Sequence, residues 1–255
     1  MSRMVFPHKA IEKIDMGKGV LVSFALCLAL SLFTSCSNED NAVPMQPVPP
    51  LVPAPANVEA VDLGLPSGTK WANMNVGAEK PEDYGRYFAW AETVGYPTDT
   101  ERKFDMASYK WFDSKTNNFT KYCTDKSFGP IDNIITLELA DDAANANWGE
   151  PWEIPTYAEI QELCNNTINE WTSVNGINGY KFTSEKNGNS IFVPATGCLG
   201  LKGIGSQGDY GYYWSVSLYP SDSGCARGFF FDKMSARTSG SSRFIGHTVR
   251  AVCRK

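Results

Sequence analysis

The sequence predicts an α+β domain in which short helices pack on a small, twisted, mostly antiparallel sheet. Helical patterns near residues 141–165 come before a run of short strand-like segments, an order that is typical of α+β folds. The 255 residues include 22 Gly and 15 Pro, and 13% are aromatic. Frequent turn residues and abundant aromatic side chains favour many short strands over a helix bundle.

The N-terminal segment, residues 1–35, has the pattern of a secretory signal peptide. An uncharged apolar run at 19–34 follows several lysines and is shorter than the ~20 residues of a membrane span. The run ends at LFTSC, which resembles the lipobox of bacterial lipoproteins and predicts that Cys36 is lipidated. The alternatives are an uncleaved anchor with a chance cysteine, and a start at Met16 rather than Met1.

Residues 36–57 are predicted to form a stalk between the lipidated cysteine and a domain at 58–255. The acidic stretch SNEDN after Cys36 resembles the surface-export signals of Bacteroidetes lipoproteins. We therefore expect an outer-membrane lipoprotein that faces the cell exterior, rather than one in the periplasmic leaflet. Residues 41–57 hold six prolines, which favour an extended polyproline conformation. The membrane is thus the first expected partner, through the lipid.

Charge and residue counts exclude several functions. The net charge is −5 and no basic stripe occurs, so nucleic acid is not an expected partner. Outside the signal peptide the only histidine is His247, which argues against a multi-histidine metal site. No CxxC motif occurs. Without Cys27 and Cys36 the cysteines that remain are odd in number, which allows at most two disulfides: Cys123, Cys164, Cys198, Cys225 and Cys253.

The first half of the domain alternates between predicted strands and irregular chain. Strands are expected at 69–76 (TKWANMNV) and at 83–93 (DYGRYFAWAET), and a long irregular insertion at 97–133. A short helix is expected around 141–147. Either Asp141 or Asp142 can cap its first amides, and Gly149 ends it.

The second half opens with a helix and continues as strands. Thr156 and Glu159 have the spacing of a capping box, and an apolar stripe of Ile160, Leu163 and Cys164 follows. Gly-rich loops then separate five strand-like segments: GYKFTS, SIFVPAT, GYYWSVS, ARGFFFD and HTVRAVC.

Several motifs together carry a family resemblance. VDLGLPSGTKWANMNVGAEKPEDYGRYFAWAET, DDAANANWGEPWEIPTYAEIQEL, GYYWSVS and GHTVRAVC resemble the Fibrobacter succinogenes major paralogous domain, over about residues 60–255. The resemblance implies a C-type-lectin-like fold, which is related to that of the formylglycine-generating enzymes. It implies no particular activity, because the family mostly lacks an assigned one.

The chain departs from this family at a few positions. Glu153 stands where the family tends to have a basic residue, and Val216 where it tends to have serine. Compared with the family pattern, Cys198 and Cys225 are additional cysteines, and they are candidates to pair with each other. Cys164 or Cys123 is then a candidate to pair with Cys253.

The aromatic stretch from Tyr210 to Trp214 is a strand, a binding surface or both. In the implied fold it lies at the sheet centre after a variable loop, 197–211. Alternation places Tyr212 and Trp214 on one face and Tyr213 and Ser215 on the other, with Trp214 predicted to be core. Loops on a rigid scaffold usually carry recognition. The candidate ligand-binding residues come from this loop and from 218–224: Lys202, Gln207, Asp209, Tyr210, Tyr212 and Asp222.

No catalytic residue, metal or cofactor is expected. The sugar-binding calcium motifs of C-type lectins are missing, and Asp209 and Asp222 are too few for calcium. The formylglycine-generating chemistry uses copper and two reactive cysteines close in sequence, and no such pair occurs. His247 is expected to be a structural hydrogen-bonder, and Arg250 to pair with a carboxylate beneath the sheet.

The function expected from the sequence is binding of an extracellular ligand, a glycan or a protein, by a non-catalytic surface lipoprotein that serves adhesion. The alternative is a structural or accessory subunit of a surface filament or envelope complex. A formylglycine-generating-like oxidase is a remote third.

Overall fold

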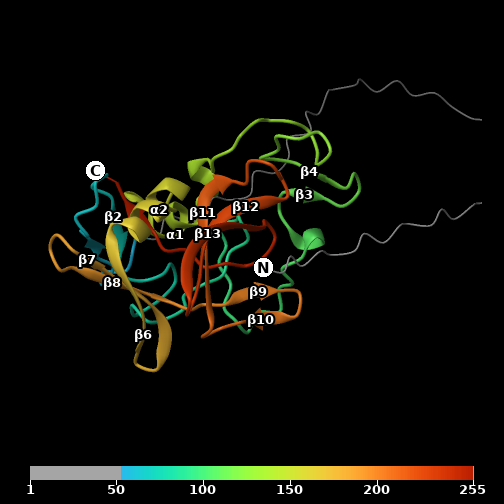
Figure 1. The fold of residues 1–255 in the computed structure, drawn as a ribbon. Coiled ribbons are helices and arrows are strands. Elements are labelled where there is room, and N and C mark those ends of the chain that lie inside the picture. Colours follow the sequence, from blue (N-terminus) through green and yellow to red (C-terminus); the bar gives the residue numbers. More distant parts are fainter. Residues whose placement is uncertain (1–52, 255) are drawn as a thin grey trace, which may run out of the picture. The chain divides into compact units, whose positions relative to one another are not determined.

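The computed structural model describes residues 53–254, so the predicted signal peptide, Cys36 and most of the stalk lie outside the described residues. Of the described residues, 10% are helical and 36% lie in strands, and the sheets are mostly antiparallel. This is compatible with the predicted α+β class and also with a mostly-β fold. In place of one small sheet, these residues form five sheets of two to four strands (Figure 1). Within 53–254, no helix has the length and apolar content to cross a membrane.

One three-stranded sheet contains the aromatic-rich segments GYYWSVS and ARGFFFD. Its strands are, in order across the sheet, β11 (Tyr210–Leu218), β12 (Cys225–Asp232) and β13 (Ser235–Ser242), all antiparallel. Strands were expected at β11 and β12, whereas the polar β13 was not. Gly211 lies against the ring of Phe231, where a Cβ atom would come within 2.0 Å of the ring, so no larger residue fits without displacing that ring.

A second three-stranded sheet follows helix α2 in the sequence. It joins β6 (Thr167–Val174), β7 (Ile177–Ser184) and β8 (Ser190–Pro194). The sequence predicts β7 and β8 but not β6, whose exposed residues are mostly polar apart from Ile168. Asn175 and Gly176 join β6 to β7 with φ angles of 49° and 83°, the left-handed conformation that two-residue hairpin turns favour.

The four-stranded sheet is built from very short strands far apart in the sequence. Its order is β1 (Ala60–Val61), β2 (Lys70–Ala72), β14 (Val252–Cys253) and β5 (Trp152–Glu153). The strands predicted at 69–76 and 247–253 therefore lie in the right parts of the chain, but the observed strands β2 and β14 are shorter. Thr248 forms only an isolated parallel bridge with Tyr213.

The two α-helices have the caps that the sequence predicts. In α1 (Ala143–Trp148), the Asp142 carboxylate accepts from the amides of Ala144 and Asn145, and Gly149 follows the last turn. In α2 (Tyr157–Asn165), Thr156 and Glu159 form the complete capping box. A 3-10 turn, η2 (Leu139–Asp141), precedes α1.

The predicted strand at 83–93 is wrong. Tyr87 and Phe88 form only isolated bridges, to Tyr96 and His247, and Ala91 has a left-handed φ of 63°. The insertion at 97–133 is irregular as predicted, apart from η1 (Met106–Ser108) and a small hairpin of β3 (Phe112–Asp113) and β4 (Asn118–Phe119). Its aromatic side chains form a core of their own with β9, because Phe104, Tyr109, Phe119 and Leu199 are buried together.

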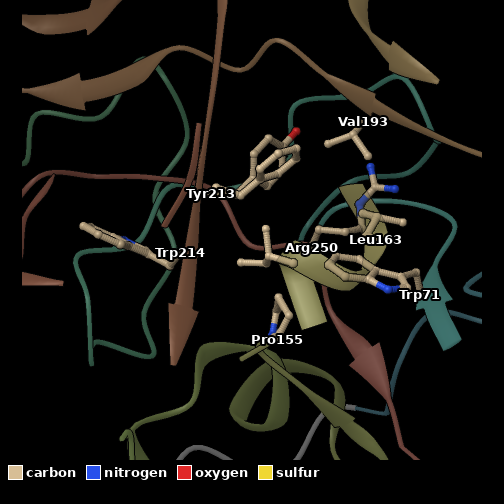
Figure 2. Close-up of a pocket in the computed structure, with 9 residues that line it drawn as sticks. Trp71, Pro155, Leu163, Val193, Tyr213, Trp214 and Arg250 are labelled. Atoms are coloured by element: carbon tan, nitrogen blue, oxygen red, sulfur yellow. The ribbon is translucent and has the colours of Figure 1, made fainter. Parts of the chain in front are cut away.

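Strand β11 separates the two largest cores of the domain. Trp214 belongs to the core that contains α1, and Tyr213 to the core beneath α2 and β7. Figure 2 shows the two rings on opposite sides of the strand. The predicted alternation is therefore confirmed, and so is the prediction that Trp214, 1% exposed, is a core residue.

Candidate ligand-binding site

The loop at 197–211, expected to be a variable binding loop, is an ordered hairpin of β9 (Cys198–Gly200) and β10 (Gly203–Gly205). Lys202 is exposed at its turn, and Asp209 is exposed at the start of β11. The Gln207 amide donates to the hydroxyl of buried Tyr87, 3.2 Å away. None of these three side chains lines any of the cavities found among the described residues.

Tyr210 and Tyr212 form a small exposed surface beside this hairpin, which we call the tyrosine patch. Their rings are stacked with centroids 6.1 Å apart, and Tyr210 is 39% exposed. The inner ring, Tyr212, also packs edge-on against Phe230 and lies 5.4 Å from His247. The patch is an aromatic surface without walls, which suits weak stacking contacts better than enclosure of a ligand.

His247 is a core residue beneath the tyrosine patch. Its ring stacks on Trp214 at 4.0 Å, and its Nε2 lies 3.3 Å from the Ser241 hydroxyl. Nδ1 is buried without a hydrogen-bond partner among the described residues. Burial lowers the pKa of His247 to about 3, so the ring is neutral at physiological pH. This supports the predicted structural role.

Asp222 does not join the other predicted residues. It lies in the turn between β11 and β12, at the opposite end of β11 from Tyr210. There it borders an open groove of about 540 Å³, within the size range of small-ligand sites. Figure 1 shows this turn beside β3 and β4, away from β9 and β10.

This cavity, which we call the phenylalanine groove, has two walls from distant parts of the chain. One wall comes from the insertion: Met106, Ala107, Phe112, Asn117, Phe119, Ser127 and Phe128. The other comes from the β11–β12 turn and the end of β13: Asp222, Gly224, Cys225, Ser242 and Phe244.

Packing among its aromatic rings organises the groove. Phe119 stacks on Phe128 at 6.2 Å and meets Phe112 edge-on at 5.5 Å. Phe119 is itself buried, whereas Phe112, Phe128 and Phe244 are half-buried. The half-buried rings leave apolar surface open to a ligand, while Phe119 anchors them to the core.

Arg243 lies behind the groove and is completely buried. Its guanidinium donates to the carbonyls of Lys121, Tyr122 and Ser223 and to the hydroxyl of Tyr109. It also lies 4.5 Å from the centroid of Phe119, within the range of a cation–π contact. One side chain thus binds both walls of the groove together.

The polar side chains of the groove are mostly neutral. No lysine or arginine lines it in the described chain, and Asp222 is its single ionisable carboxylate. One Asp222 oxygen accepts from the Gly224 amide at 2.8 Å. Burial and the neighbouring Asp222 raise the pKa of the Cys225 thiol to about 11. The thiol is therefore protonated at neutral pH and a poor nucleophile.

Two other features carry no binding function. The space lined by Trp71, Tyr213 and Arg250 is a core void of about 10 Å³, too small for an organic ligand (Figure 2). Arg250 does not pair with a carboxylate as predicted. It donates to the Asn75 side chain and to the carbonyls of Ala72 and Phe192, because carbonyls rather than acids face it there.

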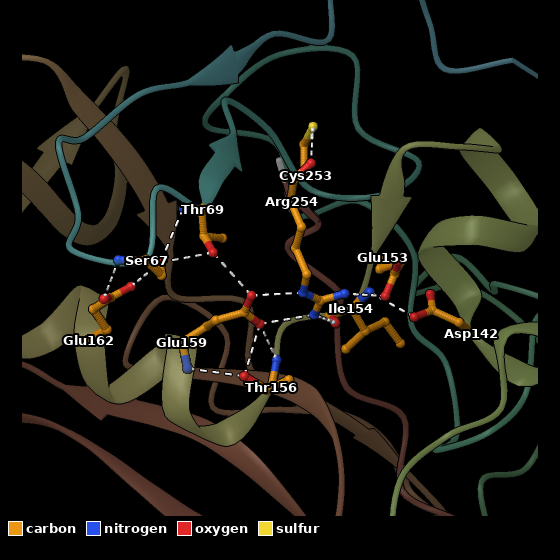
Figure 3. Close-up of polar contacts among 10 residues, drawn as sticks. All are labelled: Ser67, Thr69, Asp142, Glu153, Ile154, Thr156, Glu159, Glu162, Cys253 and Arg254. Atoms are coloured by element: carbon orange, nitrogen blue, oxygen red, sulfur yellow. Dashed lines mark hydrogen bonds and ion pairs between the residues drawn. The ribbon is translucent and has the colours of Figure 1, made fainter.

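The acidic residues near α2 form an ion-pair network with Arg254 (Figure 3). Arg254 pairs with Glu153 and, at 2.8 Å, with Glu159. Burial alone would raise the pKa of Glu159, but hydrogen bonds from Arg254 and Thr156 outweigh burial and hold the pKa low. Glu153 thus has a structural partner, and Glu159 is no proton donor at neutral pH.

The predicted disulfides are not formed. All five cysteines of the domain are free thiols, because their side chains lie in separate surroundings. Cys164 packs on the core beneath α2, Cys253 on the other side of β11, and Cys198 in the β9–β10 hairpin. Within residues 53–254, no group of three His, Cys, Asp or Glu side chains could hold a metal ion.

Comparison with protein-family models, with curated proteins and with solved structures finds no match for this chain.

The sequence reasoning missed most of the groove. Of the predicted binding residues, only Asp222 lines it. A signal was present in the insertion, where phenylalanines recur at 104, 112, 119 and 128 in an otherwise polar segment. The Asp, Ser, Thr and Asn residues between these phenylalanines favour turns over a regular helix or strand, which indicates side chains anchored individually on another surface.

Proposed function

We propose that this protein is a lipid-anchored surface protein of C-type-lectin-like fold, whose domain binds an extracellular ligand in the phenylalanine groove without catalysis. The observation that carries the proposal is the groove itself: a concave, aromatic-lined cavity of about 540 Å³ with a few polar groups at its rim. Ligand sites in proteins commonly have this combination. The lipobox-like LFTSC and the acidic stretch after Cys36 support the surface location.

The state of the ionisable groups supports the proposed absence of catalysis. Around the groove the thiol of Cys225 is protonated at neutral pH, and Asp222 has no second carboxylate beside it among the groove residues. His247, the histidine of the domain, is buried under the tyrosine patch with its pKa lowered to about 3. No nucleophile and base lie together there, as acyl-transfer or hydrolytic chemistry would require.

The anchor is tested by metabolic labelling with a palmitate analogue. The chain should be labelled and Cys36→Ala should not, and protease added to intact cells should remove the domain. Labelling that persists in Cys36→Ala, or a domain that is protected in intact cells, would contradict the anchor and the surface location respectively.

Ligand binding is tested with the detergent-purified full chain on arrays of glycans and of extracellular glycoproteins. Substitution Phe128→Ala should weaken any specific signal, because Phe128 presents a half-buried ring to the groove. Tyr210→Ala is the matched control, since it removes an exposed aromatic ring from the tyrosine patch. Binding that is lost in Tyr210→Ala and kept in Phe128→Ala would move the site to the patch. Copurification of a stoichiometric envelope protein instead would favour the structural-subunit alternative.

A further inference from the structure

The polar groups of the groove suit the hydroxyl groups of a ligand. The Asp222 carboxylate uses one oxygen for the Gly224 amide, and its other described neighbour is the weakly donating Cys225 thiol. Ser242 and Asn117 add a hydroxyl and an amide to the lining, so donors and acceptors are mixed. A carboxylate with spare acceptor capacity favours ligands that donate O–H hydrogen bonds.

The aromatic rings suit a flat apolar surface on the same ligand. Phe128 and Phe112 are half-buried and belong to one connected ring cluster, held from behind by Phe119. Because these rings have no hydroxyl or indole donor, they contribute contact area only. A ligand that fills the groove therefore has an apolar face for the rings and polar edges for Asp222, Ser242 and Asn117.

The charged residues in and behind the groove limit the class of ligand further. An anionic group would meet Asp222 with no lysine or arginine in the lining to compensate, so the carboxylate would repel it. An organic cation on the rings would be repelled by Arg243, whose buried guanidinium lies 4.5 Å from the centroid of Phe119. Asp222 at the rim disfavours an anion and Arg243 behind the rings disfavours a cation, so the groove favours a neutral ligand.

We infer that the phenylalanine groove binds a neutral carbohydrate, with the apolar face of a sugar ring on Phe128 and Phe112 and its hydroxyl groups on Asp222. A pyranose combines one face of C–H groups with equatorial hydroxyls, which is the combination that the two sets of groove residues require. This inference rests on the proposed function, since it names the ligand class of the same groove.

The experiment compares four classes of soluble probe against the full chain in detergent, by saturation-transfer NMR and calorimetry. The probes are neutral trisaccharides of glucose, mannose and galactose, a sialylated and a uronic-acid trisaccharide, a chitosan trimer, and a lysine-rich peptide. A neutral trisaccharide should bind at least about tenfold more tightly than the acidic probes. The affinity for it should fall about tenfold in Phe128→Ala and severalfold in Asp222→Asn.

Two controls separate the possible failures. Tyr210→Ala should bind as the unchanged chain does, and near-UV circular dichroism shows whether Phe128→Ala is folded; Asp222→Asn, which keeps the shape of the side chain, serves if it is not. A charged or peptide probe that binds in a Phe128-dependent way would overturn the neutral-sugar inference and leave the proposed function standing. If no probe binds and no array ligand depends on Phe128 or Asp222, both proposals are wrong.

Discussion

The two ends of strand β11 carry aromatic side chains in very different settings. At one end Tyr210 and Tyr212 follow each other along one strand and form a flat patch over a packed core. At the other end Phe112, Phe119 and Phe128 come from an irregular insertion and enclose a groove against the β11–β12 turn. In this domain, aromatic residues that are close together in the sequence thus pack on the core. The groove forms where segments distant in the sequence meet.

The largest expected effect tests whether the end of β11 that carries Tyr210 and Tyr212, the tyrosine end, is mainly structural. Trp214→Ala should lower the free energy of unfolding by about 4 kcal/mol, because it removes a fully buried indole and leaves a cavity. Tyr210→Ala, at the exposed end of the same strand, should cost less than about 1 kcal/mol. Urea denaturation of both variants measures the contrast. Similar losses in the two variants would mean that the patch is as much a part of the core as Trp214.

The next effect tests whether Arg243 holds the groove together. Arg243→Met should cost about 3 kcal/mol, since three carbonyls and a tyrosine hydroxyl lose a charged donor in a buried site. Arg237→Met is the matched control on the same strand region, because Arg237 is exposed and has only surface partners, the Ser235 hydroxyl at 2.9 Å and the Asp232 carboxylate at 3.6 Å. Denaturation profiles in which the two variants lose equal stability would contradict the assigned role of Arg243.

The end of β11 that carries Tyr210 and Tyr212 should add a pH dependence of its own through His247. His247 has a folded-state pKa of about 3, below the ordinary value of 6.5, so below pH 6.5 the unfolded chain binds a proton that the folded chain does not. Stability is therefore full above pH 6.5 and decreases as the pH falls towards 3. Between pH 6.5 and 5 this group accounts for about 2 kcal/mol. His247→Phe should flatten the profile by that amount, and an unchanged slope would show that His247 is not buried as described.

The smallest effect concerns the thiol in the groove. At pH 8, iodoacetamide should alkylate Cys225 slowly, because its pKa of about 11 leaves little thiolate, and should leave the fully buried Cys123 unmodified. Peptide mass mapping of the native chain distinguishes the two sites. A ligand bound in the groove should slow the reaction at Cys225, and faster labelling of Cys123 than of Cys225 would place the opening elsewhere.

Local features of the chain were predictable from the sequence, and contacts between distant segments were not. The capping box of Thr156 and Glu159 and the cap of α1 depend on side chains within a few residues. Spacing alone identifies the box and limits the cap to Asp141 or Asp142, of which the structure uses Asp142. The alternation along β11 is likewise local. Arg250 was assigned a carboxylate because a buried guanidinium usually has one, whereas here the fold supplies carbonyls from two other segments.

The groove was missed for the same physical reason. Its walls meet only after the insertion at 97–133 returns to β12 and β13, and no periodicity in the sequence encodes that return. Asp222 was selected as a loop residue near the tyrosines, yet nine residues of extended β11 place it at the far end of the strand.

The placement of β14 between β2 and β5 has a consequence for how quickly this chain folds. Arg250, just before β14, donates to Ala72 in β2 across 178 positions of sequence. Contacts this distant close slowly, because a long loop must be ordered before they form. Until β14 arrives, β2 and β5 expose unpaired edges beside Trp71 and Trp152. A newly synthesised chain therefore has an aggregation-prone interval, in which a chaperone that covers these tryptophan-bearing edges would raise the yield of folded protein.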